Sequence, residues 1–147
     1  MLAQLLIGSV VISATILVEA LFFVAAERAL RRMTAWMLRP PQLLRAAILL
    51  VAVTLWLMTA HSIGVWFWAA TFLHLDVFDA LEPAVYFSVV AFTTLGFGDV
   101  LLDREWRILG GLAAANGLLI FGLSTAFLVE FLRQLRQAQA RVVDRES

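Results

Sequence analysis

Seven consecutive residues in the second half of the chain, 93–99, read Thr-Thr-Leu-Gly-Phe-Gly-Asp, and the first six of them complete an uncharged block that begins at Pro83. A helix over residues 82–92 would be about 16 Å long, half of the roughly 30 Å hydrocarbon core of a bilayer. Residues 93–98 could then return to the surface only as extended backbone. Carbonyls without partners are tolerated at that depth only where they line a watery cavity or are buried in protein. The chemistry available is that of bare carbonyl oxygens in a pore-like or buried setting.

The composition places this block in a membrane. Of the 147 residues, 63% are hydrophobic and 15% are charged, whereas soluble domains average about half apolar and a quarter charged. Three further stretches, at residues 2–26, 46–73 and 108–129, are long and apolar enough to cross a bilayer as helices. A cleaved signal peptide is the alternative for the first stretch, which we disfavour because residues 1–4 carry no basic side chain. We expect an all-α membrane protein with three transmembrane helices and a re-entrant pore helix between the second and third.

Arginine placement predicts the orientation, since short cytoplasmic loops collect positive charge. Nine arginines lie between the first two spans or after the third: Arg28, Arg31, Arg32, Arg39, Arg45, Arg133, Arg136, Arg141 and Arg145. The segment between the second and third spans carries six acidic residues against two arginines: Asp76, Asp79, Glu82, Asp99, Asp103 and Glu105 against Arg104 and Arg107. We expect a multi-pass membrane protein with the N-terminus outside and the C-terminus in the cytoplasm.

Residues 93–99 resemble the selectivity filter of the potassium channel family, which runs Thr-Val/Ile-Gly-Tyr/Phe-Gly-Asp. The resemblance includes the aromatic pair Tyr86-Phe87 before the filter and the stretch 121–126 in the last helix. It implies a pore domain at residues 46–131, composed of an outer helix at 46–73, a pore helix at 82–92, a filter at 93–99 and an inner helix at 106–131. The N-terminal helix with its cytoplasmic linker, 1–45, and the cytoplasmic tail, 132–147, lie outside the common two-helix pore unit.

By this resemblance, potassium ions exchange their water for rings of backbone carbonyls from four identical chains. The implied ion-binding residues are Thr94, Leu95, Gly96, Phe97 and Gly98, with K⁺ held at the first four and at the Thr94 hydroxyl. Thr93 and Asp99 would support the filter. Glycine at 96 and 98 permits backbone dihedrals closed to other residues, so that successive carbonyls can aim at one axis. One such block cannot surround an axis, so we expect a homotetramer.

Three residues depart from the family pattern or from that of some members. Leu95 replaces the usual Val or Ile, and Phe97 lacks the tyrosine hydroxyl, so selectivity could be looser. Val90 stands where some bacterial relatives carry an acid that pairs with the filter aspartate. Asp99 must therefore find another partner, and filter inactivation should differ, which the effect of Val90→Glu on the decay of current would test.

Four kinds of residue within the spans, an asparagine, two glycines, a glutamate and a histidine, could have either a packing role or a functional one. Asn116 either bonds to a neighbouring helix, which we favour, or faces an inner cavity, while Gly117 and Gly122 either permit close packing or act as gating hinges. Glu19 is the only formal charge within a predicted span, and we expect it to reach the cytoplasmic surface or meet an arginine of the inner loop. His61 is expected to be buried and hydrogen-bonded rather than a proton sensor.

The predicted function is a potassium-selective ion channel. The alternatives are a weakly selective cation channel and a non-conducting membrane scaffold subunit in which the re-entrant block is a structural plug. No enzyme is expected, because the chain shows no nucleophile–base pair, phosphate loop or metal-binding cluster. We expect no cofactor beyond K⁺ ions in the filter. The expected partners are potassium ions, the lipid bilayer and identical subunits, with no nucleic acid.

Overall fold

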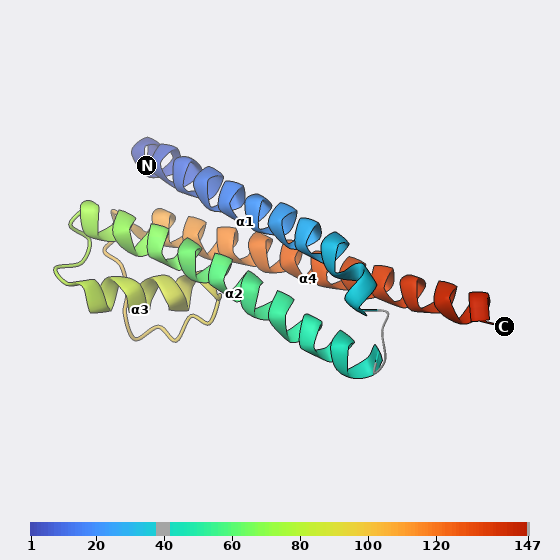
Figure 1. Cartoon of the computed structure of the whole chain (residues 1–147). Coiled ribbons are helices and arrows are strands. Elements are labelled where there is room, and N and C mark those ends of the chain that lie inside the picture. The colour runs from blue at the N-terminus through green and yellow to red at the C-terminus, as the bar shows by residue number, and fades with distance from the viewer. Residues whose placement is uncertain (38–41, 147) are drawn as a thin grey trace.

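The computed structural model describes residues 1–37 and 42–146, with side chains described in 1–33 and 43–137, and this part of the chain is entirely helical apart from its loops. The four helices are α1 (Leu2–Met37), α2 (Gln42–His74), α3 (Leu81–Phe92) and α4 (Arg107–Glu146). The three long helices run side by side, and the short α3 lies beside α2 at the end of the bundle opposite the C-terminus (Figure 1). α3 and the loop after it therefore sit at the end where α4 begins.

Three of the helices are long and apolar enough to cross a membrane. Their apolar stretches are Leu2–Met33, Leu43–His74 and Arg107–Gln137. The shortest of these, with 31 residues, extends about 46 Å and so exceeds the roughly 30 Å hydrocarbon core. α3 has 12 residues and, at about 18 Å, is too short to cross. The expectation of an all-helical chain with three helices able to span a membrane is confirmed.

Two helices continue past the point where their apolar sequence ends. The first apolar run stops at Ala26, yet α1 continues to Met37, with an ion pair between Glu27 and Arg31 at 2.6 Å. Oppositely charged residues one turn apart support a helix in water, so the charges that end the apolar run do not end the helix. α4 likewise continues to Glu146. Arg39 and the connection between α1 and α2 lie outside the described residues.

A buried apolar cluster joins α2, α3 and α4. Its largest members are Trp68 and Phe72 from α2, Phe92 from α3 and Leu109 and Ile120 from α4. Phe72 also meets Phe87 of α3 edge to face, with ring centroids 5.3 Å apart, a favoured arrangement for aromatic rings. This packing fixes α3 against both neighbouring helices and so positions the loop that follows it.

α1 lies against both α2 and α4 and presents three buried polar side chains, Gln4, Thr15 and Glu19. Their spacings of 11 and 4 residues are close to three turns and one turn, so they share one helix face. Glu19 is only 1% exposed and accepts a hydrogen bond from the Ser124 hydroxyl at 2.6 Å. The expectation that Glu19 reaches the surface or an arginine is wrong, because its face of α1 is covered by α4.

Candidate functional site

α3 ends in a tight turn made by its last carbonyls and the amides that follow. The Thr94 N–H donates to the Ala91 carbonyl at 2.9 Å, and the Leu95 N–H donates to the Val90 carbonyl at 3.0 Å. These two bonds form a Schellman C-cap, which requires a left-handed residue after the cap. Thr94 occupies that position with a φ of 58°, a conformation unusual for a β-branched residue. The chain therefore leaves the helix axis at Thr94, at a cost in backbone strain.

Left-handed conformations recur at every second residue after this turn. The φ angle is 58° at Thr94, 58° at Gly96 and 77° at Gly98, and Leu95 and Phe97 between them have no positive φ. In a β-strand, where φ keeps one sign, successive residues face opposite sides, whereas an alternating sign lets successive carbonyls turn toward one side. Glycine adopts positive φ without steric cost, which explains the residue type at positions 96 and 98.

We call residues 94–98 segment 94–98. Its carbonyl oxygens accept no hydrogen bond from the described residues. Amides at its start are used, since the Gly96 N–H also donates to Val90 at 3.3 Å. Within the part of the chain that the structure describes, no protein donor bonds to a carbonyl of segment 94–98. Leu95 and Phe97 are 55% and 65% exposed. A single chain thus presents unpaired oxygens beside uncovered apolar side chains.

Asp99 fastens the far end of this segment back to α3. The Tyr86 hydroxyl donates to the Asp99 carboxylate at 2.5 Å, and the Val100 N–H donates to its other oxygen at 3.1 Å. The hydrogen bond from Tyr86 is the main cause that lowers the pKa of Asp99 below its ordinary value. Segment 94–98 is therefore held to α3 at both ends, and Tyr86 is the partner that Asp99 needs in place of an acid at Val90.

Gly117 lets α4 approach the end of α3. A Cβ at Gly117 would overlap the carbonyl oxygen of Phe92, whereas a Cβ at Gly122 would meet nothing within 4 Å. The absence of a side chain at Gly117 is thus explained by packing against the α3 backbone. A hinge role for Gly117 or Gly122 stays a prediction.

Asn116 points toward α1. Its side-chain amide donates to the Thr15 hydroxyl at 2.7 Å, and its carbonyl oxygen is buried without a partner among the described residues. Of the two orientations considered for Asn116, the structure therefore has the bond to a neighbouring helix.

A second polar contact joins α1 to the start of α4. The Gln4 side chain donates to the Glu105 carbonyl and accepts from the Leu109 N–H at 3.2 Å.

We refer to these contacts, from Gln4, Thr15 and Glu19 to α4, as the polar seam. The sequence contains two signals for this seam: the shared face of those three residues on α1, and polar residues at Asn116 and Ser124, two turns apart on α4. Each helix alone shows polar positions, but the pairing between helices appears only in three dimensions.

No metal centre is formed in the described ranges, where no three His, Asp or Glu side chains come together. His61 is buried, with its Nδ1 2.7 Å from the Leu57 carbonyl oxygen and its ring 4.4 Å from that of Phe121. It is the buried, hydrogen-bonded histidine that the sequence led us to expect, although its Nε2 has no partner among the described residues.

Comparison with known families agrees with this architecture. Residues 46–134, more than half of the chain, match the family model described as ion channel. The protein is therefore a membrane channel by class, and the chain belongs to the ion channel family. The match covers α3, segment 94–98 and most of α2 and α4, and it leaves out α1. No curated protein and no solved structure matches the chain.

Proposed function

We propose that the chain is the subunit of a potassium-selective channel whose selectivity filter is segment 94–98. The observation that carries this proposal is the row of unpaired carbonyls directly after a short helix, in a member of the ion channel family. A potassium ion gives up its water only where other oxygens replace it. The carbonyls of residues 94–97 and the Thr94 hydroxyl would supply those oxygens.

The depth of α3 supports a re-entrant path. Gly117 lies ten residues after Arg107, the first residue of α4, which corresponds to about 15 Å along the helix and half of the hydrocarbon core. The Phe92 backbone packs against Gly117, so the end of α3 would lie near mid-membrane if α4 begins at the surface. The negative end of the α3 dipole would then face the pore and favour a cation.

Assembly of four copies would complete the site. One segment 94–98 offers oxygens from one side only, and a dehydrated ion needs them on all sides. Closed rotational symmetry places identical segments around one axis. Neighbouring copies would also cover Leu95 and Phe97, which are uncovered in the single chain. We therefore propose a homotetramer in which α2 is the outer helix, α4 the inner helix and α1 an additional outer element.

The charge distribution supports an orientation with the N-terminus outside. The last turn of α1, the first turn of α2 and the last turn of α4 lie toward one end of the bundle (Figure 1), and arginines such as Arg28, Arg32 and Arg133 lie in the halves of α1 and α4 nearer that end. Acidic residues, including Asp76 and Asp99, lie in the loops at the opposite end. Positively charged ends stay in the cytoplasm, in a bacterial inner membrane by this proposal.

Flux through purified protein in liposomes tests the function. A potassium gradient should dissipate, barium should block the flux, and the reversal potential in mixed potassium and sodium should follow potassium. A reversal potential near zero would favour a weakly selective cation channel. An absence of flux from well-folded tetramers would favour the scaffold subunit.

Two glycine substitutions test whether conduction depends on segment 94–98. Gly96→Ala places a Cβ at a φ of 58° and should abolish selectivity or conduction, because alanine resists positive φ. Gly111→Ala is the matched control, since Gly111 lies on the exposed side of α4 with nothing within 4 Å of its Cβ position. Equal flux in the two variants would contradict the assignment of the filter.

A further inference from the structure

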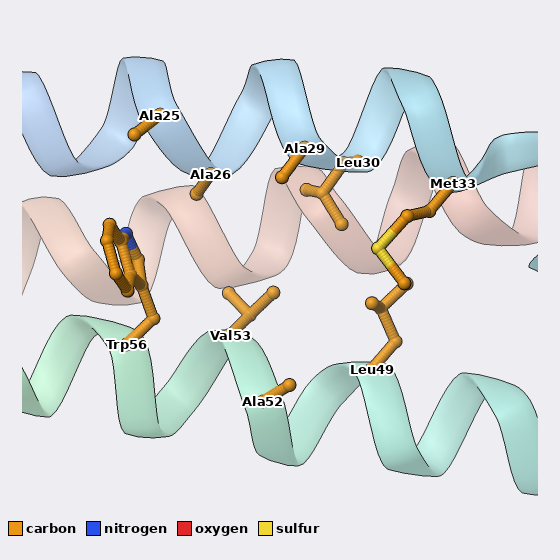
Figure 2. A pocket seen from close by; sticks show the side chains of 9 residues that line it. All are labelled: Ala25, Ala26, Ala29, Leu30, Met33, Leu49, Ala52, Val53 and Trp56. Atoms are coloured by element: carbon orange, nitrogen blue, oxygen red, sulfur yellow. The ribbon is translucent and has the colours of Figure 1, made fainter.

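An apolar groove lies between α1 and α2 at the end of the bundle that carries the arginines. It encloses about 250 Å³ and is lined by nine residues: Ala25, Ala26, Ala29, Leu30 and Met33 from α1, and Leu49, Ala52, Val53 and Trp56 from α2. In Figure 2 these side chains point toward one another from the two helices, and the α4 ribbon passes behind them. Trp56 stands at one end of the groove, and Met33 and Leu49 approach each other at the other end.

The groove exists because small residues face each other across the helix pair. Four of the nine lining residues are alanines, which leave space that larger side chains would fill. Trp56 is held in place at the end of the groove away from Met33. Its indole N–H donates to the Phe22 carbonyl at 3.1 Å, and its ring stacks on that of Phe22 with ring centroids 4.5 Å apart. Met33 at the arginine end is unbranched and adaptable, so the groove can admit a flexible chain there.

Arginines stand beside the groove. At 100° per residue, Arg28 lies 60° around α1 from Ala25 and Arg32 lies 60° from Ala29, both toward the same edge of the groove, and both arginines are exposed. Arg31 lies on the opposite side of α1, where it pairs with Glu27. An apolar slot within a membrane-spanning stretch thus has two positive charges along one edge, Arg28 and Arg32, that have no acidic partner among the described residues.

We propose that this groove binds one acyl chain of an anionic phospholipid, whose headgroup phosphate is held by Arg28 and Arg32. The groove opens from helices that cross the membrane, so lipid tails are the apolar molecules present around it. The arginines add charge complementarity to an anionic headgroup, and each basic residue near the surface strengthens such binding about fivefold. This lipid site goes beyond the proposed channel function, and its binding can be measured whether or not the protein conducts.

A second groove between the same helices serves as an internal contrast. It lies at the other end of α1 and α2, encloses about 640 Å³, and has Leu6, Val10, Phe67, Ala70 and His74 among its lining residues. The charges of the adjoining loop, such as Asp76 and Asp79, are acidic. This second groove could accept lipid tails but should not select an anionic headgroup.

Lipid titration of the purified full chain in detergent, followed by native mass spectrometry, tests the proposal. With dioleoyl phosphatidylglycerol and dioleoyl phosphatidylcholine as probes, the unaltered chain should prefer the anionic lipid by at least about fivefold. Ala29→Trp fills the groove and should abolish this preference, whereas Ala70→Trp, which fills the second groove, should retain it. Unchanged unfolding temperatures in the two variants verify that both are folded.

Charge substitutions test the headgroup contact independently of the groove volume. Arg32→Gln should lower the preference for phosphatidylglycerol about fivefold, and the matched control Arg31→Gln, on the opposite side of α1, should leave it unchanged. Equal binding of the two lipids by the unaltered chain, or an equal loss in Arg32→Gln and Arg31→Gln, would overturn the proposal. A change of oligomeric state in Ala29→Trp, with lipid preference intact, would instead make the groove an interface between copies and would also overturn it.

Discussion

At the scale of single residues, the Tyr86–Asp99 hydrogen bond links pH to the proposed filter. This bond lowers the pKa of Asp99, so its carboxylate stays ionised to a lower pH than an ordinary aspartate. The contribution of the bond is present above the ordinary pKa of aspartate and is lost as pH falls through the lowered value. Lowering the pH on the side of the membrane that carries Asp99 should therefore disturb the segment only below the pH at which an ordinary aspartate is protonated.

Tyr86→Phe removes the donor and should raise the pKa of Asp99 toward its ordinary value. The acid-induced loss of current should then occur at a higher pH than in the unaltered protein, as measured by titrating the pH on the side that carries Asp99. The control is Tyr86→Phe in an Asp99→Asn background, where the substitution should cause no further shift. An identical midpoint in the Tyr86→Phe single variant and the unaltered protein would contradict the link.

The close contact between Gly117 and the Phe92 backbone should leave no room for a side chain. Gly117→Ala should destabilise the fold by about 1–3 kcal/mol, because its Cβ would overlap the Phe92 carbonyl and overpacking costs that much. Alanine gains up to about 1 kcal/mol over glycine in a helix, so the overlap should exceed the gain. Gly111→Ala, without that overlap, should be neutral or stabilising in a thermal unfolding series. A Gly117→Ala variant as stable as Gly111→Ala would rule out the close contact.

The sequence predicted some of these residues and not others, for a physical reason. Segment 94–98 could be found because its conformation depends on its own residue types: glycine at 96 and 98 permits the positive φ that the structure has there. The contact of Gly117 with Phe92 depends on where two helices meet, and no spacing within either helix specifies it. Tyr86 stood in the resemblance only as half of an aromatic pair, and its bond to Asp99 closes a loop of 13 residues.

At the scale of helices, hydropathy predicted the spans because lipid acts on each helix separately. The end of α1 was not predicted, since charged residues leave the membrane without ending a helix. The side of α1 that meets α4 was not predicted either. In lipid, helix association depends on packing and hydrogen bonds rather than on burial of apolar surface, so an apolar sequence does not mark the contact face, and only Gln4, Thr15 and Glu19 did.

The polar seam should contribute measurably to the docking of α1. Thr15→Val removes the acceptor for the Asn116 amide and leaves a second polar group of Asn116 buried without a partner. Hydrogen bonds between membrane helices average about 0.6 kcal/mol and reach about 1.7, so a loss in this range is expected in unfolding titrations. Thr59→Val is the matched control, because the Thr59 hydroxyl is exposed and bonds only to the Leu55 carbonyl of its own helix. Equal losses would show that the seam does not hold α1.

At the scale of the whole molecule, the proposed filter is incomplete in a single copy of the chain. The buried apolar cluster fixes α3 against α2 and α4. Segment 94–98 is bonded to α3 at its start through the Val90 carbonyl and just past its end through Asp99. In one chain, the carbonyls of the segment have no protein donor among the described residues, and Leu95 and Phe97 are more than half exposed. The proposed function therefore depends on a surface that only other copies can supply, which makes subunit number the property to measure.

Mixing of subunits measures that number through function. If four chains share one filter and one Gly96→Ala chain suffices to spoil it, an equal mixture with unaltered chains leaves about one pore in sixteen composed of four intact copies, against about one in four for a dimer. Potassium flux from liposomes containing the co-expressed mixture should therefore fall to about a sixteenth. The same mixture made with Gly111→Ala, which lies on the exposed side of α4, should keep full flux. Flux reduced only by half would mean that each chain conducts alone, and a shared filter would then be excluded.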